Sequence, residues 1–583
     1  MKRLVFSVPL LAVSILIAVS AFAVVNGTTV TTIVSPDTAI TSDWIPSFAT
    51  PSCGNGTQGS SHNCNFSVAK NNNDTSALQP VCTITAGSIP AGQTVSCSGI
   101  TGTPTAAGAV SATIRACVGL NCTYEDVNYT IASSGSGTIT AALAASRTSG
   151  PAPLAVRFDA IGTTHSGGLD TFREVYYEFT FDDAGSGNWP NTSDSRNTER
   201  GGPIAAHVFE SAGSYTVTVT AVDASGITDT ETVSITVSDP DTYYSGTNTV
   251  CVSPSSNYTG CPSGASQLTA MPTPADGKRY LLHAGESYGG ISFNFVDNWQ
   301  LGRYGTGSDP AITSDIKVNS SNPGSSTAWS TNGVVMNMNV SGAITQEVSA
   351  ENILFFRNTS TKRYRVGGAL EYYFGANGSN SNPNYTWPKN IFIVENYLDL
   401  NNDSTEPVNV WMYADGAVIA GNDFRNPNEH TIRTPLLYKT FIGHNYLTGI
   451  GASKHFVKIH AIGKQNFASS LATANEPATQ YVVVGNNIFG NGTTDYSAQS
   501  VAACPKNETS DEGVQDVIVE DNYFAVDPIQ EIVFGGKRLT SRDDNTGTTS
   551  IVTGTGCKGD ILGTWDGPYY LNQNVSQFTT YLD

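Results

Sequence analysis

The amino-acid sequence predicts an all-β protein, with two N-terminal modules of short strands followed by a parallel β-helix. The composition is the first reason. Only 13% of the 583 residues are charged, while there are 57 Gly and 5 Met, which suits short strands joined by turns better than long amphipathic helices. The second reason is the alternation of apolar and polar residues that is typical of half-buried strands. The third is a motif in the C-terminal half that recurs at the spacing of a solenoid coil.

The net charge restricts the classes of partner. The chain has 29 basic and 49 acidic residues, which gives a charge of −20 at neutral pH. This charge disfavours nucleic acid or an anionic membrane surface as a partner of the whole molecule. Length and composition also exclude a coiled coil, a multi-pass membrane protein and a simple disordered chain.

Residues 1–23 predict a secretory signal peptide. Lys2 and Arg3 precede an apolar stretch, and Ala21-Phe22-Ala23 has the small-x-small form of a cleavage site. An uncleaved membrane anchor is the alternative. No later stretch has the length of a membrane span, so we expect a secreted or cell-surface protein with no membrane insertion after cleavage.

The ten cysteines agree with export, because an even number is expected where disulfides persist. We expect a local disulfide between Cys251 and Cys261 and a distant one between Cys504 and Cys557. The connectivity of the other six stays open: Cys53, Cys64, Cys82, Cys97, Cys117 and Cys122.

Residues 24–132, called module 1 below, carry short Thr/Val/Ile strands between Gly, Pro and Ser turns. One segment begins with Gly87-Ser88-Ile89-Pro90-Ala91-Gly92 and ends with Gly102-Thr103-Pro104-Thr105-Ala106-Ala107-Gly108. It resembles the immunoglobulin-like repeats of bacterial surface proteins. The resemblance implies a β-sandwich that serves as a spacer and carries no chemistry.

Residues 138–238, called module 2 below, resemble a PKD domain. The resemblance rests on three segments: Tyr177-Glu178-Phe179-Thr180-Phe181-Asp182-Asp183, Ala206-His207-Val208-Phe209 and Gly213-Ser214-Tyr215-Thr216-Val217-Thr218-Val219. It implies a second β-sandwich. The alternation of Tyr215, Val217, Val219 and Ala221 independently predicts a half-buried strand. We expect His207 to be a structural histidine.

Residues 246–583, called the β-helix below, repeat the template apolar-x-apolar-x-x-Asn. Its Asn positions are Asn358, Asn396, Asn422, Asn445, Asn487 and Asn522. Their spacing indicates a base period near 23–26 residues with insertions, as expected for the coils of a parallel β-helix. Alternate apolar residues would fill a continuous core, and Asn tolerates the left-handed bend between two strands. Stacked coils also allow equivalent Asn side chains to bond one another. An Asn-rich sandwich is the alternative.

The same residues resemble the secreted right-handed β-helix proteins of the pectate-lyase-like class. Leu281-Leu282-His283-Ala284-Gly285-Glu286 and the stretch that begins with Leu301-Gly302-Arg303 look like their first coils. The resemblance implies a right-handed β-helix, and it identifies a scaffold better than an activity.

A basic segment between residues 424 and 475 is the candidate functional site. It holds six basic residues and one acid, Glu429, together with half of the eight histidines of the chain. Residues 429–433 recur 25 positions later as residues 454–458. One coil of separation would place His430 beside His455 and Arg433 beside Lys458, about 4.8 Å apart.

The direction of these side chains follows from strand alternation. If Ile432 and Val457 point inward, then Arg433, Lys458 and His460 point outward. By the same parity, the side chains of His430 and His455 would point inward or lie in the preceding bend.

We interpret the segment as a site for an anionic, uronate-containing polysaccharide. Two neighbouring cations repel by about 1 kcal/mol in water, so the pair is unfavourable without an anion. The predicted contact residues are Glu429, His430, Lys454, His455, Trp411 and Tyr413, the last two as a stacking platform. A solvated basic face paired with acids from an insertion is the alternative.

Two functions stay open: a polysaccharide lyase working by β-elimination, and a non-catalytic adhesin or glycan binder. Elimination needs a cation at the carboxylate, a base at C5 and a donor for the leaving oxygen. Arg433 would bind the carboxylate, Lys458 or Lys439 would be the base, and His444 or His460 would be the donor. No cofactor is certain. Calcium is compatible with the loops at Asn401-Asn402-Asp403 and Ser510-Asp511-Glu512.

Overall fold

The structure is a computed structural model, which describes most of the chain from residue 46 onward. The described residues are 46–58, 60–70, 79–118, 121–132, 137–319, 329–347, 349–367, 388–451, 454–460, 479–490, 499–504, 514–525, 532–542, 545–547, 551–553, 569–579 and 581–582. The predicted signal peptide lies outside them. Among the described residues, no helix combines the length and apolar character needed to cross a membrane.

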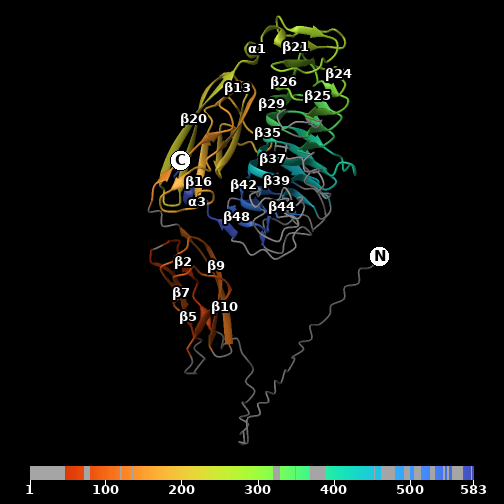
Figure 1. The fold of residues 1–583 in the computed structure, drawn as a ribbon. Helices are drawn as coiled ribbons and strands as arrows, with labels where there is room; N and C mark the ends of the chain where they lie inside the picture. Colours follow the sequence, from red (N-terminus) through yellow and green to blue (C-terminus); the bar gives the residue numbers. More distant parts are fainter. Residues whose placement is uncertain are drawn as a thin grey trace, which may run out of the picture.

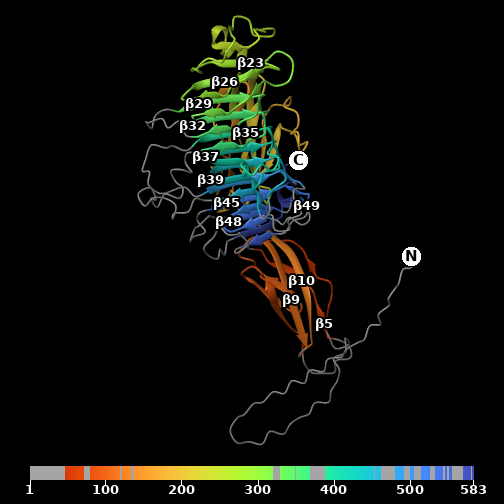
Figure 2. The same ribbon diagram turned by 90° about the vertical axis from the view of Figure 1, so that its right-hand side faces the viewer.

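The protein is all-β, as the sequence predicts. Module 2 lies lengthwise against the β-helix, and module 1 lies beyond one end of both (Figures 1 and 2). The described helices are short, and they connect or close the β modules: α1 (Pro240–Tyr243), the 3₁₀ turn η2 (Gly246–Asn248) and α3 (Ser576–Thr579).

Module 1 is built mainly from antiparallel strands and is held by three disulfides. Two four-stranded sheets, β3-β10-β9-β6 and β2-β4-β8-β7, enclose a core that contains Ile100, Ile114 and Val127. The strands are β1 (Ser47–Phe48), β2 (Ser52–Cys53), β3 (Gly56–Thr57), β4 (His62–Asn65), β5 (Val68–Ala69), β6 (Val81–Gly87), β7 (Gln93–Ser96), β8 (Gly99–Gly102), β9 (Gly108–Val118) and β10 (Asn121–Ala132). The disulfides are Cys53–Cys64, Cys82–Cys97 and Cys117–Cys122, a connectivity that the sequence left open.

Module 2 is a β-sandwich whose main sheets are β12-β14-β18 and β13-β20-β19-β16-β17. Its strands are β11 (Ile139–Thr140), β12 (Ala144–Ala145), β13 (Ser149–Pro151), β14 (Leu154–Asp159), β15 (Thr164–His165), β16 (Val175–Thr180), β17 (Thr198–Gly201), β18 (Ile204–Phe209), β19 (Gly213–Asp223) and β20 (Thr228–Ser238). The alternate residues predicted in β19 are buried in the core. His207 is fully buried, bonds Asp183 at 3.0 Å and stacks on Phe181, so its predicted structural role is confirmed.

The C-terminal module is a parallel β-helix with three sheets, named A, B and C here. Sheet A contains β25 (Ile291–Phe293), β28 (Ile316–Val318), β31 (Ile344–Gln346), β34 (Tyr364–Val366), β41 (His455–Ile459), β44 (Gln499–Ala503), β47 (Ile532–Phe534) and β50 (Ile551–Thr553). Two long strands, β37 (Val408–Ala420) and β39 (His430–Gly443), run through both sheet A and sheet B.

Sheets B and C complete each coil. Sheet B contains β21 (Thr249–Val252), β22 (Ser266–Leu268), β23 (Arg279–His283), β26 (Asp297–Tyr304), β29 (Ser330–Met336), β32 (Ala350–Phe356), β35 (Lys389–Val394), β42 (Thr479–Gly485), β45 (Val514–Glu520), β48 (Lys537–Arg542) and β51 (Tyr569–Gln573). Sheet C contains β24 (Ser287–Tyr288), β27 (Ala311–Ile312), β30 (Asn339–Val340), β33 (Thr359–Ser360), β36 (Tyr397–Asp399), β38 (Asp423–Arg425), β40 (Tyr446–Thr448), β43 (Ile488–Phe489), β46 (Tyr523–Phe524) and β49 (Thr546–Gly547).

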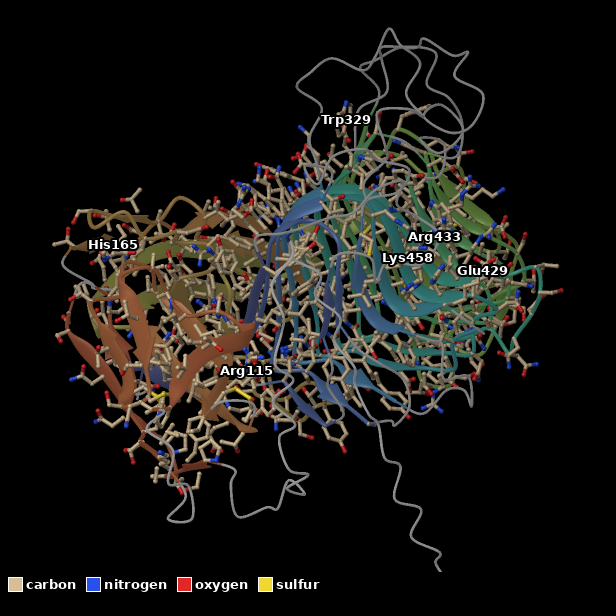
Figure 3. All side chains as sticks on the ribbon, turned by 90° about the horizontal axis from the view of Figure 1, so that it is seen from below. Arg115, His165, Trp329, Glu429, Arg433 and Lys458 are labelled. Carbon is tan, nitrogen blue, oxygen red and sulfur yellow. A yellow bond between two sulfur atoms is a disulfide. The ribbon has the colours of Figure 1, made fainter. Side chains whose placement is uncertain are left out.

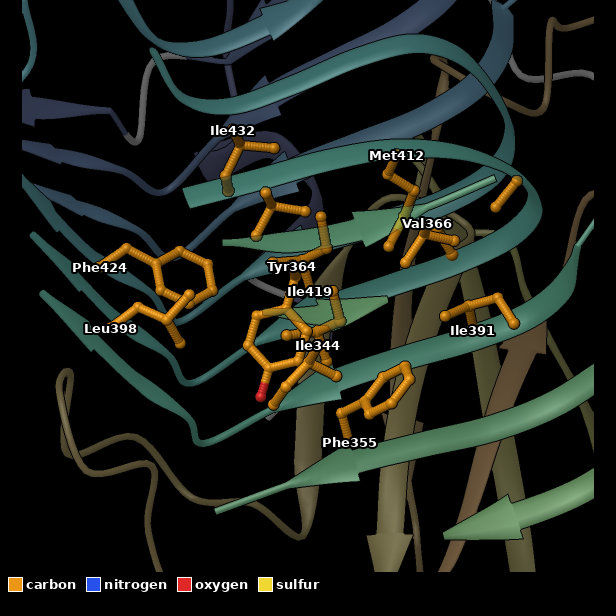
Figure 4. Close-up of a cluster of buried hydrophobic side chains, with 14 of the residues drawn as sticks. Ile344, Phe355, Tyr364, Val366, Ile391, Leu398, Met412, Ile419, Phe424 and Ile432 are labelled. Atoms are coloured by element: carbon orange, nitrogen blue, oxygen red, sulfur yellow. The ribbon is translucent and has the colours of Figure 1, made fainter. Parts of the chain in front are cut away.

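The interior of the β-helix is a continuous apolar column, because alternate residues of every strand point inward. Figure 4 shows part of it, where Phe355, Ile391, Ile419 and Ile432 of successive coils all point into the same core. All four are fully buried.

An asparagine ladder runs along the bend between sheets B and C. Each Asn amide donates to the side-chain oxygen of the next Asn at 2.9–3.1 Å, in the order Asn358, Asn396, Asn422, Asn445, Asn487, Asn522 and Asn545. The predicted stacking is confirmed and extends one coil further. The predicted left-handed bend is displaced by one position, because the residues with positive φ are those before the ladder Asn, such as Glu395 (54°) and His444 (57°). The ladder side chain instead accepts a bond from the backbone of the preceding coil.

The remaining cysteines partly test the disulfide predictions. The predicted Cys251–Cys261 bond is present. Cys504 is disulfide-bonded as well, and Cys557, its predicted partner, lies outside the described residues.

Module 2 packs tightly on the outer face of sheet B. Its contribution is an apolar surface made by Ala155, Trp189, Ile204, Ala206 and Val208. Sheet B contributes Val334, Leu354, Phe356, Phe392, Val394, Val418, Ala420, Phe441 and Val483. A shared buried core of this kind makes module 2 and the β-helix one unit rather than beads on a linker.

Candidate functional site

The predicted cation pair lies on the outer face of sheet A. Ile432 pairs with Val457 and Arg433 pairs with Lys458, so the predicted register is confirmed. Trp411 of the preceding coil pairs with Arg433. Ile432 and Val457 belong to the core. Because side chains alternate along a strand, Arg433 and Lys458 point outward, as does Trp411, which pairs with Arg433. Figure 3 shows Glu429, Arg433 and Lys458 together, on the side of the β-helix away from module 2.

Arg433 is the best placed of these residues to meet a ligand. Its guanidinium lies 4.6 Å from the centre of the Trp411 ring, and its side chain is 17% exposed. One carboxylate, Glu429, serves two cations: Arg433 at 3.9 Å and Lys454 at 3.5 Å. Neither distance is that of a close ion pair, so both cations keep donors for another anion.

Two donors in this cluster lack an acceptor among the described residues. They are the indole nitrogen of Trp411 and Nε of Arg433, both shielded from solvent. Lys458, the neighbour of Arg433, is only 6% exposed. Arg433 and Trp411 are therefore the accessible side chains of this cluster, while the side chain of Lys458 lies below the surface.

His430 and His455 form a buried pair beneath this face. Their rings stack at 5.1 Å, and the backbone N–H of His455 donates to Nδ1 of His430 at 3.1 Å. Burial lowers the pKa of His430, and its neighbours His455, Lys458 and Arg433 lower it further. His430 is therefore neutral, mainly because it is buried. The pair lies on the inner side of the cluster, as the alternation of side chains along the strands predicts.

Tyr413 and His460 lie away from the open surface. Tyr413 is 4% exposed and follows an irregularity in the pairing of β37 with β39, so Trp411 is the accessible ring of the predicted platform. His460 is fully buried, and its carbonyl accepts a bond from Thr479. The structure thus places both among supporting residues.

Lys439 and His444 are not brought to this face at all. Both lie where β39 passes beneath module 2. Lys439 Nζ is 3.4 Å from Asp159. The ring of His444 stacks on Trp189 at 4.8 Å, and its Nε2 bonds Glu199 at 2.8 Å. Both side chains serve the interface between the modules, and the geometry separates them from Arg433.

The electrostatics of His444 differ from those of His430. Burial alone would lower its pKa, but the carboxylates of Glu199 and Asp194 outweigh this and raise the pKa to about 9. In turn, the hydrogen bond from His444 lowers the pKa of Asp194. His444 is charged and paired at neutral pH.

The column of outward residues on sheet A is longer than the sequence segment suggested. Arg365 pairs in register with Trp411, and Lys317 lies two coils before Arg365. The sequence could have predicted the outward direction of both side chains. Each is the middle residue of an apolar-x-apolar triplet, such as Tyr364-x-Val366, in which the flanking residues point inward. Arg365 lies 3.7 Å from Glu347.

No metal ligand set emerges from the part of the chain that the structure describes. It contains no group of three His, Cys, Asp or Glu side chains suited to an ion. Asp403, in one loop considered for calcium, is paired with Lys362 at 2.7 Å, which lowers its pKa. The other loop, at residues 510–512, lies outside the described residues.

Comparison with known families identifies one module. The PKD family model matches residues 140–237, which cover almost all of module 2. Module 2 is a PKD domain. No curated protein matches the chain. The resemblances of module 1 to immunoglobulin-like repeats and of the β-helix to the pectate-lyase-like class stay predictions.

Three similar solved structures each match about a third of the chain. The adhesin InvE of Yersinia pseudotuberculosis shares 14% identity over 32% of this chain and 58% of its own, with a TM-score of 0.20. Protocadherin gamma B7 shares 11% over 33% of this chain and 49% of its own, with a TM-score of 0.19. An endo-fucoidan hydrolase of glycoside hydrolase family 107 shares 17% over 35% of this chain and 30% of its own, with a TM-score of 0.15. The matched part thus spans at most 58% of these three structures.

The docked position of the PKD domain indicates its structural role. A spacer or an independent sugar-binding appendage would keep its faces free. Here one face of the PKD domain covers sheet B and pairs with Lys439 and His444 of the β-helix. The PKD domain is therefore part of the scaffold that presents sheet A.

Proposed function

We propose that this is a secreted or cell-surface protein that binds an anionic, uronate-containing polysaccharide through sheet A of its β-helix. The single observation that carries the proposal is the column Trp411–Arg433–Lys458, with Lys454 beside it. The ring gives a stacking surface for a sugar, and the cations give donors for its carboxylates.

The charge around the column supports an anionic ligand. Arg433 and Lys454 share one carboxylate at distances beyond a close contact. Beside the larger effect of burial, Lys458, Arg433 and Lys454 all act to lower the pKa of His430, as expected where cations gather. In a protein of net charge −20, this is a local inversion of sign that attracts anions at close range.

The test is affinity electrophoresis of the full chain in gels that contain polygalacturonate, alginate or heparin. A hydrogen bond to a charged group contributes about 1.5–3 kcal/mol, so Arg433→Ala should weaken binding by about tenfold or more. Lys454→Ala should act in the same direction. The matched control is Arg303→Ala, because Arg303 is a half-exposed arginine near a carboxylate, Asp309, on the first coils. Equal retardation of wild type and Arg433→Ala by every polymer would refute the proposal.

β-Elimination is the second candidate function. One observation favours it: Arg433 and Lys458 pair in register on the neighbouring strands β39 and β41. Arg433 would neutralise the uronate carboxylate, and Lys458 would take the proton at C5. Solvent water would protonate the leaving oxygen, because His444 and His460 lie away from this surface. An increase in ultraviolet absorbance from unsaturated uronates, lost in both Arg433→Ala and Lys458→Ala, would establish a lyase. Binding without that absorbance assigns the protein to the non-catalytic class.

A further inference from the structure

The outer face of sheet C carries a regular column of tyrosines. Tyr397, Asp423, Tyr446, Ile488 and Tyr523 follow one another in register on β36, β38, β40, β43 and β46. A tyrosine thus occupies every second coil. Tyr397 is 38% exposed and Tyr523 is 50% exposed, and both are among the most exposed large apolar side chains described.

The side chains between the rings hold them in place. The guanidinium of Arg425 lies 5.5 Å from the ring centre of Tyr397 and 5.6 Å from that of Tyr446. Tyr446 also rests on Gly490, where an added Cβ would lie 3.0 Å from the ring. The rings of Tyr397 and Tyr446 are therefore fixed before any ligand arrives, which lowers the entropy cost of binding.

The column carries no net charge. Arg425 makes two bonds to Asp423, at 2.7 and 2.8 Å, and this carboxylate raises the pKa of Arg425. The face therefore offers ring surfaces, hydroxyl groups and a neutralised ion pair, with one further carboxylate, Asp399, beside Arg425. This contrasts with sheet A, where two cations share one acid.

We propose that the outer face of sheet C binds an extended neutral polysaccharide that runs along the β-helix axis. Parallel strands lie about 4.8 Å apart, so successive tyrosines are about 9.6 Å apart. An extended β-linked polysaccharide presents the same face of its sugar ring at every second residue, and one sugar residue is close in length to one strand spacing. Each tyrosine therefore meets an equivalent ring face, while Arg425 and the phenol hydroxyls serve the sugar hydroxyls.

A linear polymer explains the column better than a globular partner. Isolated exposed tyrosines are common on protein surfaces and need no explanation. Three in one register column, at a constant interval of two coils, match a ligand that itself repeats along a line. This surface is separate from the basic cluster on sheet A and does not depend on the function proposed there.

The test is affinity electrophoresis of the full chain in hydroxyethyl cellulose and in galactomannan, two soluble neutral polysaccharides. Each of Tyr397→Ala, Tyr446→Ala and Tyr523→Ala should weaken binding about three- to tenfold, as loss of one ring contact does, and the triple variant about a hundredfold. The matched controls are Tyr124→Ala and Tyr243→Ala, since these tyrosines are 58% and 44% exposed but lie outside the column. Thermal unfolding of every variant checks that the fold is kept.

Three results would overturn the inference. The first is the absence of retardation of the wild type by both neutral polymers. The second is retardation that the triple variant keeps. The third is concentration-dependent dimerisation of the wild type that the triple variant abolishes, which would make the column a contact between copies of this chain. Arg433→Ala should leave the neutral gels unchanged, so failure here is distinct from failure of the anionic site.

Discussion

His444 carries a proton at neutral pH because two carboxylates of the PKD domain face its ring. The ring is fully shielded, with Nε2 bonded to Glu199 and Nδ1 3.4 Å from Asp194. The sequence indicates His444 as a candidate proton donor, whereas in the structure its charged ring joins the β-helix to the PKD domain. Its pKa, raised to about 9, ties the stability of the interface to pH.

We expect the free energy of unfolding to fall as pH rises from 6.5 to 9. The folded-state pKa of His444 lies above its unfolded value of 6.5, so its contribution is complete below pH 6.5 and is lost as pH passes about 9. The loss amounts to about 3 kcal/mol at most. Urea unfolding at several pH values measures it. His444→Gln should flatten the curve in this window, and an unchanged slope in the variant would contradict the assignment.

The ion pair between Glu520 and Arg542 is a second buried contact at this interface. The two side chains are 2.8 Å apart and almost fully buried, and Glu520 also accepts from the backbone of Gly202. Removing one partner leaves an uncompensated buried charge, so Arg542→Met should cost about 3–5 kcal/mol. The more exposed pair of Asp423 with Arg425 supplies the control, since Asp423→Ala should cost about 1 kcal/mol or less. Equal losses in urea unfolding would show that burial does not decide the effect.

At the scale of elements, the asparagine ladder fixes the register of the coils. Asn422 shows the pattern: its amide donates to Ile393 and Asn445, and its oxygen accepts from the backbone and side chain of Asn396. The ladder residues from Asn358 to Asn522 are buried, so replacing one of them leaves several buried polar groups without partners.

Asn422→Ala should therefore destabilise the protein by about 2–4 kcal/mol, more than a single hydrogen bond contributes. Asn339→Ala is the control, because Asn339 is an exposed residue on sheet C outside the ladder. Chemical denaturation of both variants gives the comparison. A loss at Asn422 no larger than at Asn339 would mean that the ladder does not stabilise the stack.

These elements also show what the sequence could and could not predict. The coils, the ladder and the pairing of Arg433 with Lys458 follow from spacing, because each depends on residues one coil apart. Lys439 and His444 share the same segment, yet their partners come from the PKD domain, and His444 is 245 residues from Glu199. Local spacing contains no information on which sheet a second module covers. The sequence pattern does not predict the tyrosine column, because each tyrosine directly follows a ladder Asn and therefore resembles a residue of the bend.

At the scale of the whole molecule, the PKD domain and the β-helix should unfold as one cooperative unit. Their shared apolar layer includes Trp189 from one module and Phe392 and Phe441 from the other. Burial of such rings contributes about 1.5–3 kcal/mol each. Docking on sheet B leaves sheets A and C as the faces on which the two proposed polysaccharide sites lie.

Gly421 gives a direct test of this docking. It adopts φ of 67°, and a Cβ added there would lie 2.7 Å from the Trp189 ring of the PKD domain. Gly285 is the matched control, with φ of 78° and no atom within 4 Å of an added Cβ. Gly285→Ala should cost about 1–2 kcal/mol, the strain of a left-handed residue. Gly421→Ala should cost the same strain plus about 1–3 kcal/mol of overpacking.

The readouts are urea unfolding and small-angle X-ray scattering of both variants. In Gly421→Ala the overpacked Trp189 should loosen the contact between the modules, which raises the radius of gyration while Gly285→Ala keeps the wild-type value. Equal costs and equal radii in the two variants would mean that the PKD domain does not rest on sheet B in solution. His444 and Lys439 would then be open to solvent. The basic segment could no longer be divided into residues that contact the PKD domain and residues that bind a ligand on sheet A.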